Sequence, residues 1–207
     1  GVAVPDRLPP TPARDGRALT LGFAGRLHPF KGVDRLLEWM GSAVREGADL
    51  RLLIRGEAAP EDGAYRDRLS RIVIEEGLDG RVSFEGFVEG ADRVYAGVDV
   101  VAVPSVVPDP LPRAVMEGMA RGLPVIGYPA GGIPDMVRDG RTGFLVSDGA
   151  GFAAAVARLG HSAQAYESFG RAAYEHARDN LSLAHLHQRL NATYEALLGS
   201  SRTGEGV

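Results

Sequence analysis

The chain has 207 residues, of which 44% are hydrophobic, and this is enough for one sizeable core in a soluble domain. Its 23 basic and 27 acidic side chains give a formal charge of −4, which argues against a protein that binds nucleic acid or a membrane surface through a basic patch. The absence of cysteine excludes disulfides, thiol nucleophiles and thiolate metal sites.

Residues 1–18 are rich in proline, arginine and aspartate without apolar periodicity, so we expect them to form a linker. A short apolar run at 19–25 then predicts a buried parallel strand, and from there strands and helices alternate. The further expected strands cover 50–56, 82–84, 99–104, 124–128 and 143–146. The expected helices cover 33–46, 62–76, 91–97, 112–121, 133–138, 150–159, 163–179 and 183–198.

This alternation predicts an α/β fold, with a Rossmann-like, doubly wound parallel sheet of about six strands and helices on both faces. Ligands bind such sheets at the carboxyl ends of the strands, so the segments that follow strands are the candidate binding segments. These segments contain neither a Walker loop nor the G-x-G-x-x-G pattern of dinucleotide-binding proteins.

No apolar run approaches the roughly 18 residues that a membrane helix requires, and no signal peptide is visible. The chain begins with Gly1 rather than Met, so we expect further residues upstream in the natural protein. We expect a cytoplasmic location, with attachment to the inner face of the membrane as an alternative for the full-length protein.

The first candidate segment follows the first strand and carries Arg26 and Lys31, just before the helix that begins after Gly32. Two cations beside a helix N-terminus favour a diphosphate site. The alternative, two solvated loop cations, is equally compatible with this segment alone. For His28, which lies between the cations, an ordinary loop residue is favoured over a third phosphate donor.

The second candidate segment follows the fourth strand, with Asp109 in the loop and Glu117 eight positions later in the next helix. Pro112 fits the first helical position. Glu117 can accept hydrogen bonds from two ribose hydroxyls, and Asp109 can hold a sugar hydroxyl. Spacing alone slightly favours the alternative, a salt-bridged surface formed by Glu117 with Arg113 and Arg121.

The third candidate segment, 130–146, has Gly131 and Gly132 between a strand and a short helix. Taken alone, this pair is more typical of a tight turn than of a backbone that approaches a ligand.

Three motifs occur in order: G-R-L-x-x-x-K-G, P-S-x(3)-acid-P-x(6)-E and G-G-I-P-[DE]-x-V-x-[DN]-G-x-[TN]-G-x-L-V. Together they resemble those of glycosyltransferase family four, the retaining "group 1" transferases of the GT-B fold, over residues 19–148. The resemblance implies that residues 19–207 are the C-terminal, donor-binding domain of a two-domain enzyme. It also implies that residues 1–18 are a remnant of the interdomain linker and that the N-terminal, acceptor-binding domain is absent from this chain.

By this resemblance, Arg26 and Lys31 would bind the donor diphosphate, Glu117 the ribose and Asp109 the donor sugar, and these four would be the catalytic residues. Asp109 is one methylene shorter than the glutamate usual there. Other expected contacts are Gly25 beside the diphosphate, Phe87 and Val88 near the base, and the backbone of Leu111, Pro112, Arg113 and Ala114 near the sugar and phosphate.

The implied reaction moves a sugar from a UDP- or GDP-type donor to an acceptor hydroxyl, with retention at the anomeric carbon. The cations and helix N-termini would stabilise charge on the departing diphosphate, so we expect no covalent nucleophile, no cofactor and no metal. The isolated domain should bind donor without catalysing transfer. Alternatives are a non-catalytic nucleotide-sugar-binding domain and a GT-B nucleotide-sugar epimerase.

The expected partners are the nucleotide sugar and the missing N-terminal domain, and no nucleic acid. The last helix has an apolar stripe, which we expect to be exposed or to mediate self-association in this chain. The stripe consists of Leu183, Leu186, Leu190, Leu197 and Leu198.

Overall fold

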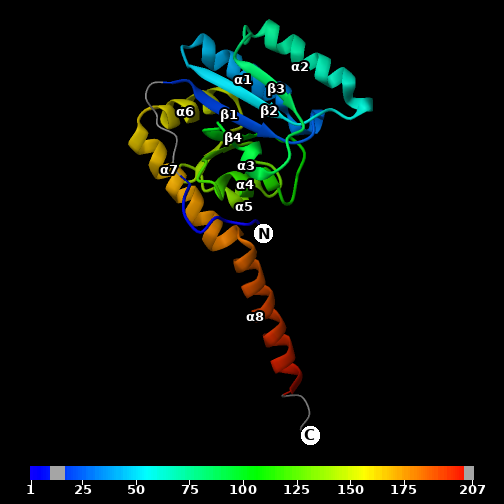
Figure 1. Cartoon of the computed structure of the whole chain (residues 1–207), viewed down its shortest axis with the longest axis vertical. Coiled ribbons are helices and arrows are strands. Elements are labelled where there is room, and N and C mark those ends of the chain that lie inside the picture. Colours follow the sequence, from blue (N-terminus) through cyan, green and yellow to red (C-terminus); the bar gives the residue numbers. More distant parts are fainter. Residues whose placement is uncertain (10–16, 203–207) are drawn as a thin grey trace.

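The computed structural model describes residues 1–9 and 17–202, with side chains described as far as Leu198. Six parallel strands form one sheet in the order β3-β2-β1-β4-β5-β6, which confirms the predicted fold class (Figure 1). The strands are β1 (Leu19–Ala24), β2 (Leu50–Arg55), β3 (Val82–Gly86), β4 (Val100–Val103), β5 (Val125–Gly127) and β6 (Gly143–Leu145).

The order of the strands locates the place where a ligand is expected to bind. From β1 the chain builds outward through β2 and β3, then returns to the other side of β1 to add β4, β5 and β6. The connections after β1 and β4 therefore leave the sheet in opposite directions, and a crevice opens between the carboxyl ends of these two strands.

The helices cover both faces of the sheet and form two apolar cores. One core involves α1 (Val33–Arg45), α2 (Gly63–Glu75) and α6 (Gly149–Gly160), and the other involves α3 (Ala91–Val94), α4 (Arg113–Met119) and α5 (Ile133–Met136). The helix α7 (Ala163–His176) contributes side chains to both cores.

The helix α1 shows why these segments fold as predicted. Its residues Leu36, Leu37 and Met40 recur at helical spacing and are fully buried against the sheet. The strand β1 is almost entirely buried, as expected of a parallel strand covered on both faces. Most boundaries differ by only a residue or two, but α3 and α7 end three residues earlier than predicted and α8 ends four residues later. The helix α4 begins at Arg113, so Pro112 is its N-cap rather than its first helical residue.

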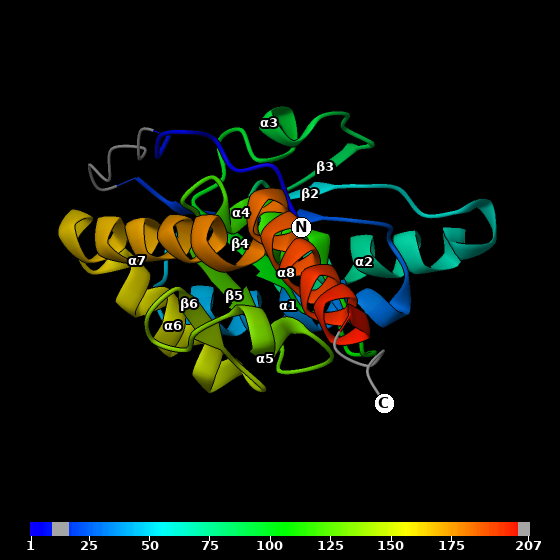
Figure 2. The same ribbon diagram turned by 90° about the horizontal axis from the view of Figure 1, so that it is seen from below.

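Two short 3₁₀ turns precede the first two helices, at Pro29–Lys31 and Pro60–Asp62. After α7 a π-helical turn, Ala177–Leu181, leads into the last helix, α8 (Leu183–Arg202). Figure 2 shows α7 and α8 meeting at a bend, with the N-terminus beside the start of α8. Hydrogen bonds fix this junction, because the Val2 N–H donates to the Leu181 carbonyl and the Leu183 N–H donates to the Val2 carbonyl.

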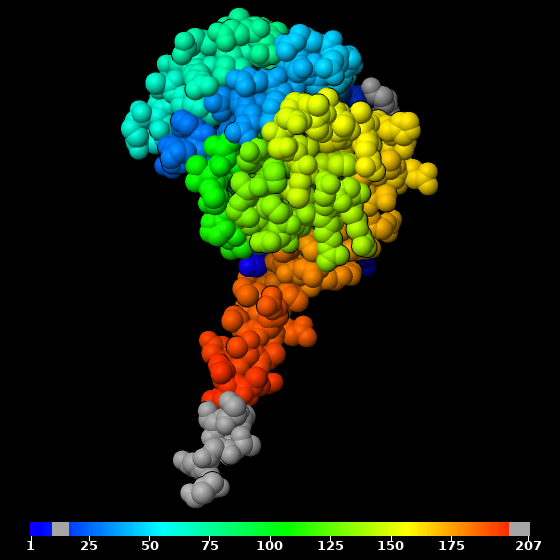
Figure 3. Space-filling view, turned by 180° about the vertical axis from the view of Figure 1, so that it is seen from behind, coloured from blue at the N-terminus to red at the C-terminus, as the bar shows by residue number. Residues whose placement is uncertain are grey.

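The helix α8 projects away from the rest of the domain (Figure 1 and Figure 3). The predicted exposure of its apolar stripe is confirmed, since Leu183, Leu186, Leu190, Leu197 and Leu198 are 39–68% exposed. Tyr194, which is 61% exposed, extends the same apolar surface.

Candidate functional site

Two adjoining cavities lie at the carboxyl edge of the sheet. One, of about 530 Å³, is bordered by the segments after β2 and β3 and by α3 and α4. The other, of about 320 Å³, lies between the ends of β1 and β4 and the loop before α4. Both cavities are lined by Ala24, Gly25, Arg26, Arg113 and Ala114, so they form one continuous depression at the predicted crevice.

The predicted site residues meet in this depression. Those around the smaller cavity are Gly25, Arg26, Lys31, Asp109, Leu111, Pro112, Arg113 and Ala114. Phe87, Val88 and Glu117 line the larger one, together with Arg26. Arg26 and Glu117 therefore lie on the same face of the domain.

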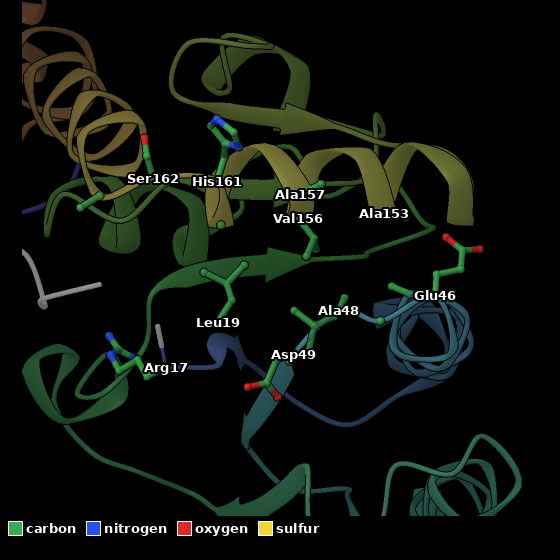
Figure 4. A pocket seen from close by; sticks show the side chains of 15 residues that line it. Arg17, Leu19, Glu46, Ala48, Asp49, Ala153, Val156, Ala157, His161 and Ser162 are labelled. Atoms are coloured by element: carbon green, nitrogen blue, oxygen red, sulfur yellow. The ribbon is translucent and has the colours of Figure 1, made fainter. Parts of the chain in front are cut away.

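A larger cavity, of about 660 Å³, lies at the opposite edge of the sheet and is shown in Figure 4. Its labelled polar side chains include Asp49, His161 and Ser162, which come from the start of β2 and the junction of α6 and α7. Arg17 also lines it, and its guanidinium is paired with the buried carboxylate of Asp99. None of the predicted site residues lies there.

The turn that carries Lys31 is fixed against the end of β4. Gly32 has φ of +66°, and a Cβ at this position would lie 2.2 Å from the Pro104 carbonyl oxygen. Only glycine therefore permits this close approach. The Val106 N–H donates to the Phe30 carbonyl at 3.0 Å and secures the same contact.

His28 has a structural role in this turn. Its Nδ1 accepts a hydrogen bond from the Phe30 N–H at 3.2 Å, which caps the 3₁₀ turn, and its Nε2 lies 3.8 Å from an Asp62 carboxylate oxygen. This geometry agrees with the interpretation of His28 as a loop residue rather than a third phosphate donor.

Lys31 and Asp109, expected to contact different parts of one ligand, form an ion pair. The Lys31 Nζ lies 3.2 Å from Asp109 Oδ2, while Asp109 Oδ1 accepts from the Leu111 N–H at 3.1 Å. Both side chains are about one-third exposed, at 34% and 32%. An anionic ligand entering here would compete with Asp109 for Lys31, and a bound sugar would lie beside both.

Gly131 and Gly132 support the loop that carries Asp109. Gly131 has φ of +57°, and a Cβ there would lie 2.5 Å from the Asp109 backbone. The Gly132 N–H donates to the Asp109 carbonyl at 2.9 Å, and a Cβ there would lie 2.3 Å from the Pro110 carbonyl oxygen. The pair forms a tight turn, as expected, and this turn also positions the Asp109 loop.

Both oxygens of the Glu117 carboxylate have partners. Oε1 lies 2.8 Å from Arg113 Nη2 and Oε2 lies 3.3 Å from the Tyr95 hydroxyl. Arg121 instead binds the Asp92 carboxylate and donates to the Glu117 carbonyl at 3.0 Å. The alternative of a salt-bridged surface is therefore correct only for Arg113, which pairs with the Glu117 carboxylate. The Arg121 side chain binds Asp92 in α3 instead.

Tyr95 is a site residue that the sequence reading missed. Its side chain is buried, and its hydroxyl lies 3.4 Å from the Ala114 carbonyl as well as near Glu117. Burial, reinforced by the negative charge of Glu117, raises the pKa of Tyr95 well above its usual range, so the hydroxyl stays protonated and acts as a donor. The helix α3 has only four residues, too few for apolar periodicity to identify an inward face.

Arg55 fixes the backbone around Tyr95. Its Nη1 donates to the carbonyls of Val94 and Ala96, each at 2.8 Å, and its Nε donates to Glu85 at 2.8 Å. The Arg55 side chain is only 10% exposed. A charged side chain of β2 thus ties the end of α3 to the sheet beside the larger cavity.

Phe87 lies at the rim of the larger cavity and is 73% exposed. Its N–H donates to Glu57 Oε1 at 3.2 Å, which holds the segment after β3 near the end of β2. An exposed aromatic ring at a cavity rim is suited to stacking on a planar group.

Among the described residues there is no cluster of acidic or histidine side chains that could hold a metal ion, and none of the helices described has the length and apolarity to cross a membrane.

Comparison with known proteins agrees with this geometry. A family model described as "Glycosyl transferases group 1" matches residues 18–162. The chain belongs to this family. It is 34% identical over 188 residues to a D-inositol 3-phosphate glycosyltransferase of Corynebacterium efficiens, covering 86% of this chain and 42% of that protein. The chain thus spans less than half the length of this relative.

Two solved structures have the same fold as this chain. The Anabaena protein Alr3699/HepE, in complex with UDP and glucose, superposes with a TM-score of 0.79 at 25% identity, over 87% of this chain and 49% of that one. The C-terminal domain of the group 1 protein LpcC from Francisella tularensis superposes with a TM-score of 0.75 at 22% identity, over 88% of this chain and all of that one. The chain therefore has the fold of the C-terminal domain of a group 1 glycosyltransferase.

Proposed function

We propose that this chain is the donor-binding half of a retaining glycosyltransferase that uses a nucleotide-diphosphate sugar. The observation that carries the proposal is the arrangement of groups in one continuous depression. The exposed aromatic side chain of Phe87 and the carboxylate of Glu117 line the larger cavity, Arg26 lines both cavities, and Lys31 and Asp109 line the smaller one. This arrangement suits a base and ribose in the larger cavity, a diphosphate where the two cavities join, and a sugar in the smaller one.

The chemistry follows from where charge develops. Breaking the bond between the sugar and the diphosphate leaves negative charge on the diphosphate. Arg26 and Lys31 would stabilise this charge from positions set before the reaction, which lowers the barrier without a covalent intermediate. The UDP-bound Anabaena relative supports UDP as the first donor nucleotide to test. Asp109, which lies against Lys31, would then hold a hydroxyl of the transferred sugar.

The acceptor would be bound by a second domain outside this chain. The exposed stripe on α8 supports this proposal, because a contiguous apolar patch on a projecting helix is typical of a surface that contacts another protein or domain. Residues 1–18 would then be the connection to that domain. The chain alone should bind donor and should not transfer sugar.

A titration and an incubation test the proposal. Calorimetry of the chain with UDP, GDP and their glucose and mannose conjugates should give one site for one of the two nucleotides, with tighter binding than for the free nucleoside. Incubation of the chain with the preferred sugar nucleotide should release no free nucleoside diphosphate. Absence of binding to every nucleotide in the panel would refute the donor site.

The epimerase alternative is less well supported by the site. Such an enzyme needs acid–base groups around the sugar. The smaller cavity has Asp109 as its only carboxylate among the described residues, and no histidine lines either cavity in the part of the chain described.

A further inference from the structure

We infer that Tyr95 is a positioning residue, which orients the Glu117 carboxylate so that it can accept the ribose hydroxyls of the nucleotide. The inference rests on the proposed donor site, and it assigns to Tyr95, which borders the larger cavity beside Glu117, a role exerted through that carboxylate. Its basis is the hydrogen bond of 3.3 Å between the Tyr95 hydroxyl and Glu117 Oε2.

The two partners of Glu117 differ in how firmly they are held. The Arg113 side chain is 81% exposed and comes from the same helix, four residues earlier, so its ion pair with Glu117 is weak and easily exchanged. Tyr95 is 5% exposed and caps the end of α3, so it reaches Glu117 from outside α4. A ribose hydroxyl can replace Arg113 at Oε1, whereas Tyr95 stays at Oε2.

Tyr95 is itself held on several sides. Arg55 binds the backbone carbonyls on either side of it, at Val94 and Ala96. The Arg121 guanidinium lies 5.6 Å from the centre of the Tyr95 ring and is fixed by Asp92 and by the Glu117 carbonyl. The position of the hydroxyl is therefore determined by the sheet and by α4 before any ligand arrives.

The single proton of the Tyr95 hydroxyl can go to either the Ala114 carbonyl or the Glu117 carboxylate, at 3.4 and 3.3 Å. The carboxylate is the stronger acceptor because it is charged. Donation to Oε2 restrains the carboxylate at one oxygen and leaves Oε1, held only by the exposed Arg113, to accept from the ribose hydroxyls.

The test compares Tyr95→Phe with the wild type in binding UDP and 2′-deoxy-UDP, with GDP and 2′-deoxy-GDP used if the wild type prefers guanine. Tyr95→Phe keeps the ring and removes only the hydroxyl. We expect affinity for the ribonucleotide to fall by about threefold to tenfold. Affinity for the 2′-deoxy nucleotide should change less, so the preference for ribose should shrink. A residue that only packs would weaken both nucleotides equally.

Tyr174→Phe is the matched control. Tyr174 is also buried, at 5% exposure, and its hydroxyl donates to the Pro5 carbonyl at 2.6 Å, away from both site cavities. This variant should lose thermal stability without any change in nucleotide affinity. Thermal unfolding of both variants shows whether each is folded at the temperature of the titrations.

A double mutant separates positioning from direct binding. In a Glu117→Ala background, Tyr95→Phe should cause no further loss of ribonucleotide affinity, because the group it orients is gone. An equal loss in both backgrounds would overturn the inference. The inference would also be overturned if Tyr95→Phe kept the wild-type preference for the ribonucleotide while Glu117→Ala weakened binding. That result would leave the proposed donor site intact. Failure of the wild type to bind any of these nucleotides would instead overturn the proposed function, and the inference with it.

Discussion

Replacing Glu117 by glutamine should weaken nucleotide binding without unfolding the domain. The substitution keeps the size of the side chain and removes its charge. In the free protein it breaks the ion pair with Arg113, whose side chain is 81% exposed, so the cost in the free energy of unfolding is about 0.3–0.5 kcal/mol. The amide oxygen can still accept from Tyr95. For a domain of this size the Tm should fall by only about 1–2 °C.

The effect on binding should be much larger. A hydrogen bond to a charged group contributes about 1.5–3 kcal/mol, so loss of the carboxylate should weaken UDP or GDP binding by about tenfold to a hundredfold. Calorimetric titration with the nucleoside diphosphate alone isolates the ribose contact, because the sugar and its contact to Asp109 are left out.

Glu76→Gln provides the control. The Glu76 side chain is 22% exposed, close to the 18% of Glu117, and it pairs with Arg45 at 2.6 Å, outside both site cavities. This variant should lose a similar small amount of stability and bind nucleotide like the wild type. Unchanged affinity in Glu117→Gln would refute the assignment of Glu117 to the ribose, and would leave the exposed ion pair as its role.

Four further outcomes are expected. Lys31→Met should weaken UDP or GDP binding by about tenfold and flatten its dependence on salt in titrations at two ionic strengths; an unchanged affinity would place the diphosphate elsewhere. Gly132→Ala should lower the free energy of unfolding by about 1–3 kcal/mol in thermal melts, because its Cβ would meet the Pro110 carbonyl; a neutral result would contradict the tight packing of the Asp109 loop. Leu190→Glu, at a position 44% exposed, should change stability by less than about 0.5 kcal/mol and abolish any self-association seen by sedimentation; a large loss of stability would contradict the exposed stripe. Because burial raises the pKa of Tyr95 in the folded state, the free energy of unfolding should fall as pH rises past about 10, and Tyr95→Phe should reduce this fall in denaturant titrations; equal slopes would argue against a buried, protonated Tyr95.

The sequence predicted the fold because local pattern and global fold agree in most of this chain. The strand 19–25 and the helix 33–46 have the periodicities of a buried strand and of a helix with one buried face, and the structure places them so. The site residues also meet as expected, since parallel strands bring their carboxyl ends to one edge. The predicted roles of Arg26, Lys31, Asp109 and Glu117 in binding and transfer stay predictions.

Helical spacing predicted the pairing of Arg113 with Glu117, but the other pairings within the site could not be predicted, because they depend on side chains far apart in sequence. Helical spacing suggested that Arg121 faces the Glu117 carboxylate, whereas its guanidinium reaches Asp92 in another helix. Lys31 follows β1 and Asp109 follows β4, so their contact joins segments separated by three crossover connections. Spacing rules describe one helix at a time, and they do not reveal which neighbour a long side chain will find across the sheet edge.

The way α8 is attached has a mechanical consequence. The helix has 20 residues, about 30 Å at 1.5 Å per residue, and it leaves the domain from the π-helical turn Ala177–Leu181. It therefore acts as a lever arm: a rotation of roughly 10° about its base would carry the far end through about 5 Å. Two backbone hydrogen bonds of Val2, to Leu181 and from Leu183, hold the chain on both sides of Ser182 at the base of the helix. A small change in backbone conformation at these hydrogen bonds, too slight to disturb the core, would therefore produce a large displacement of the far end of α8.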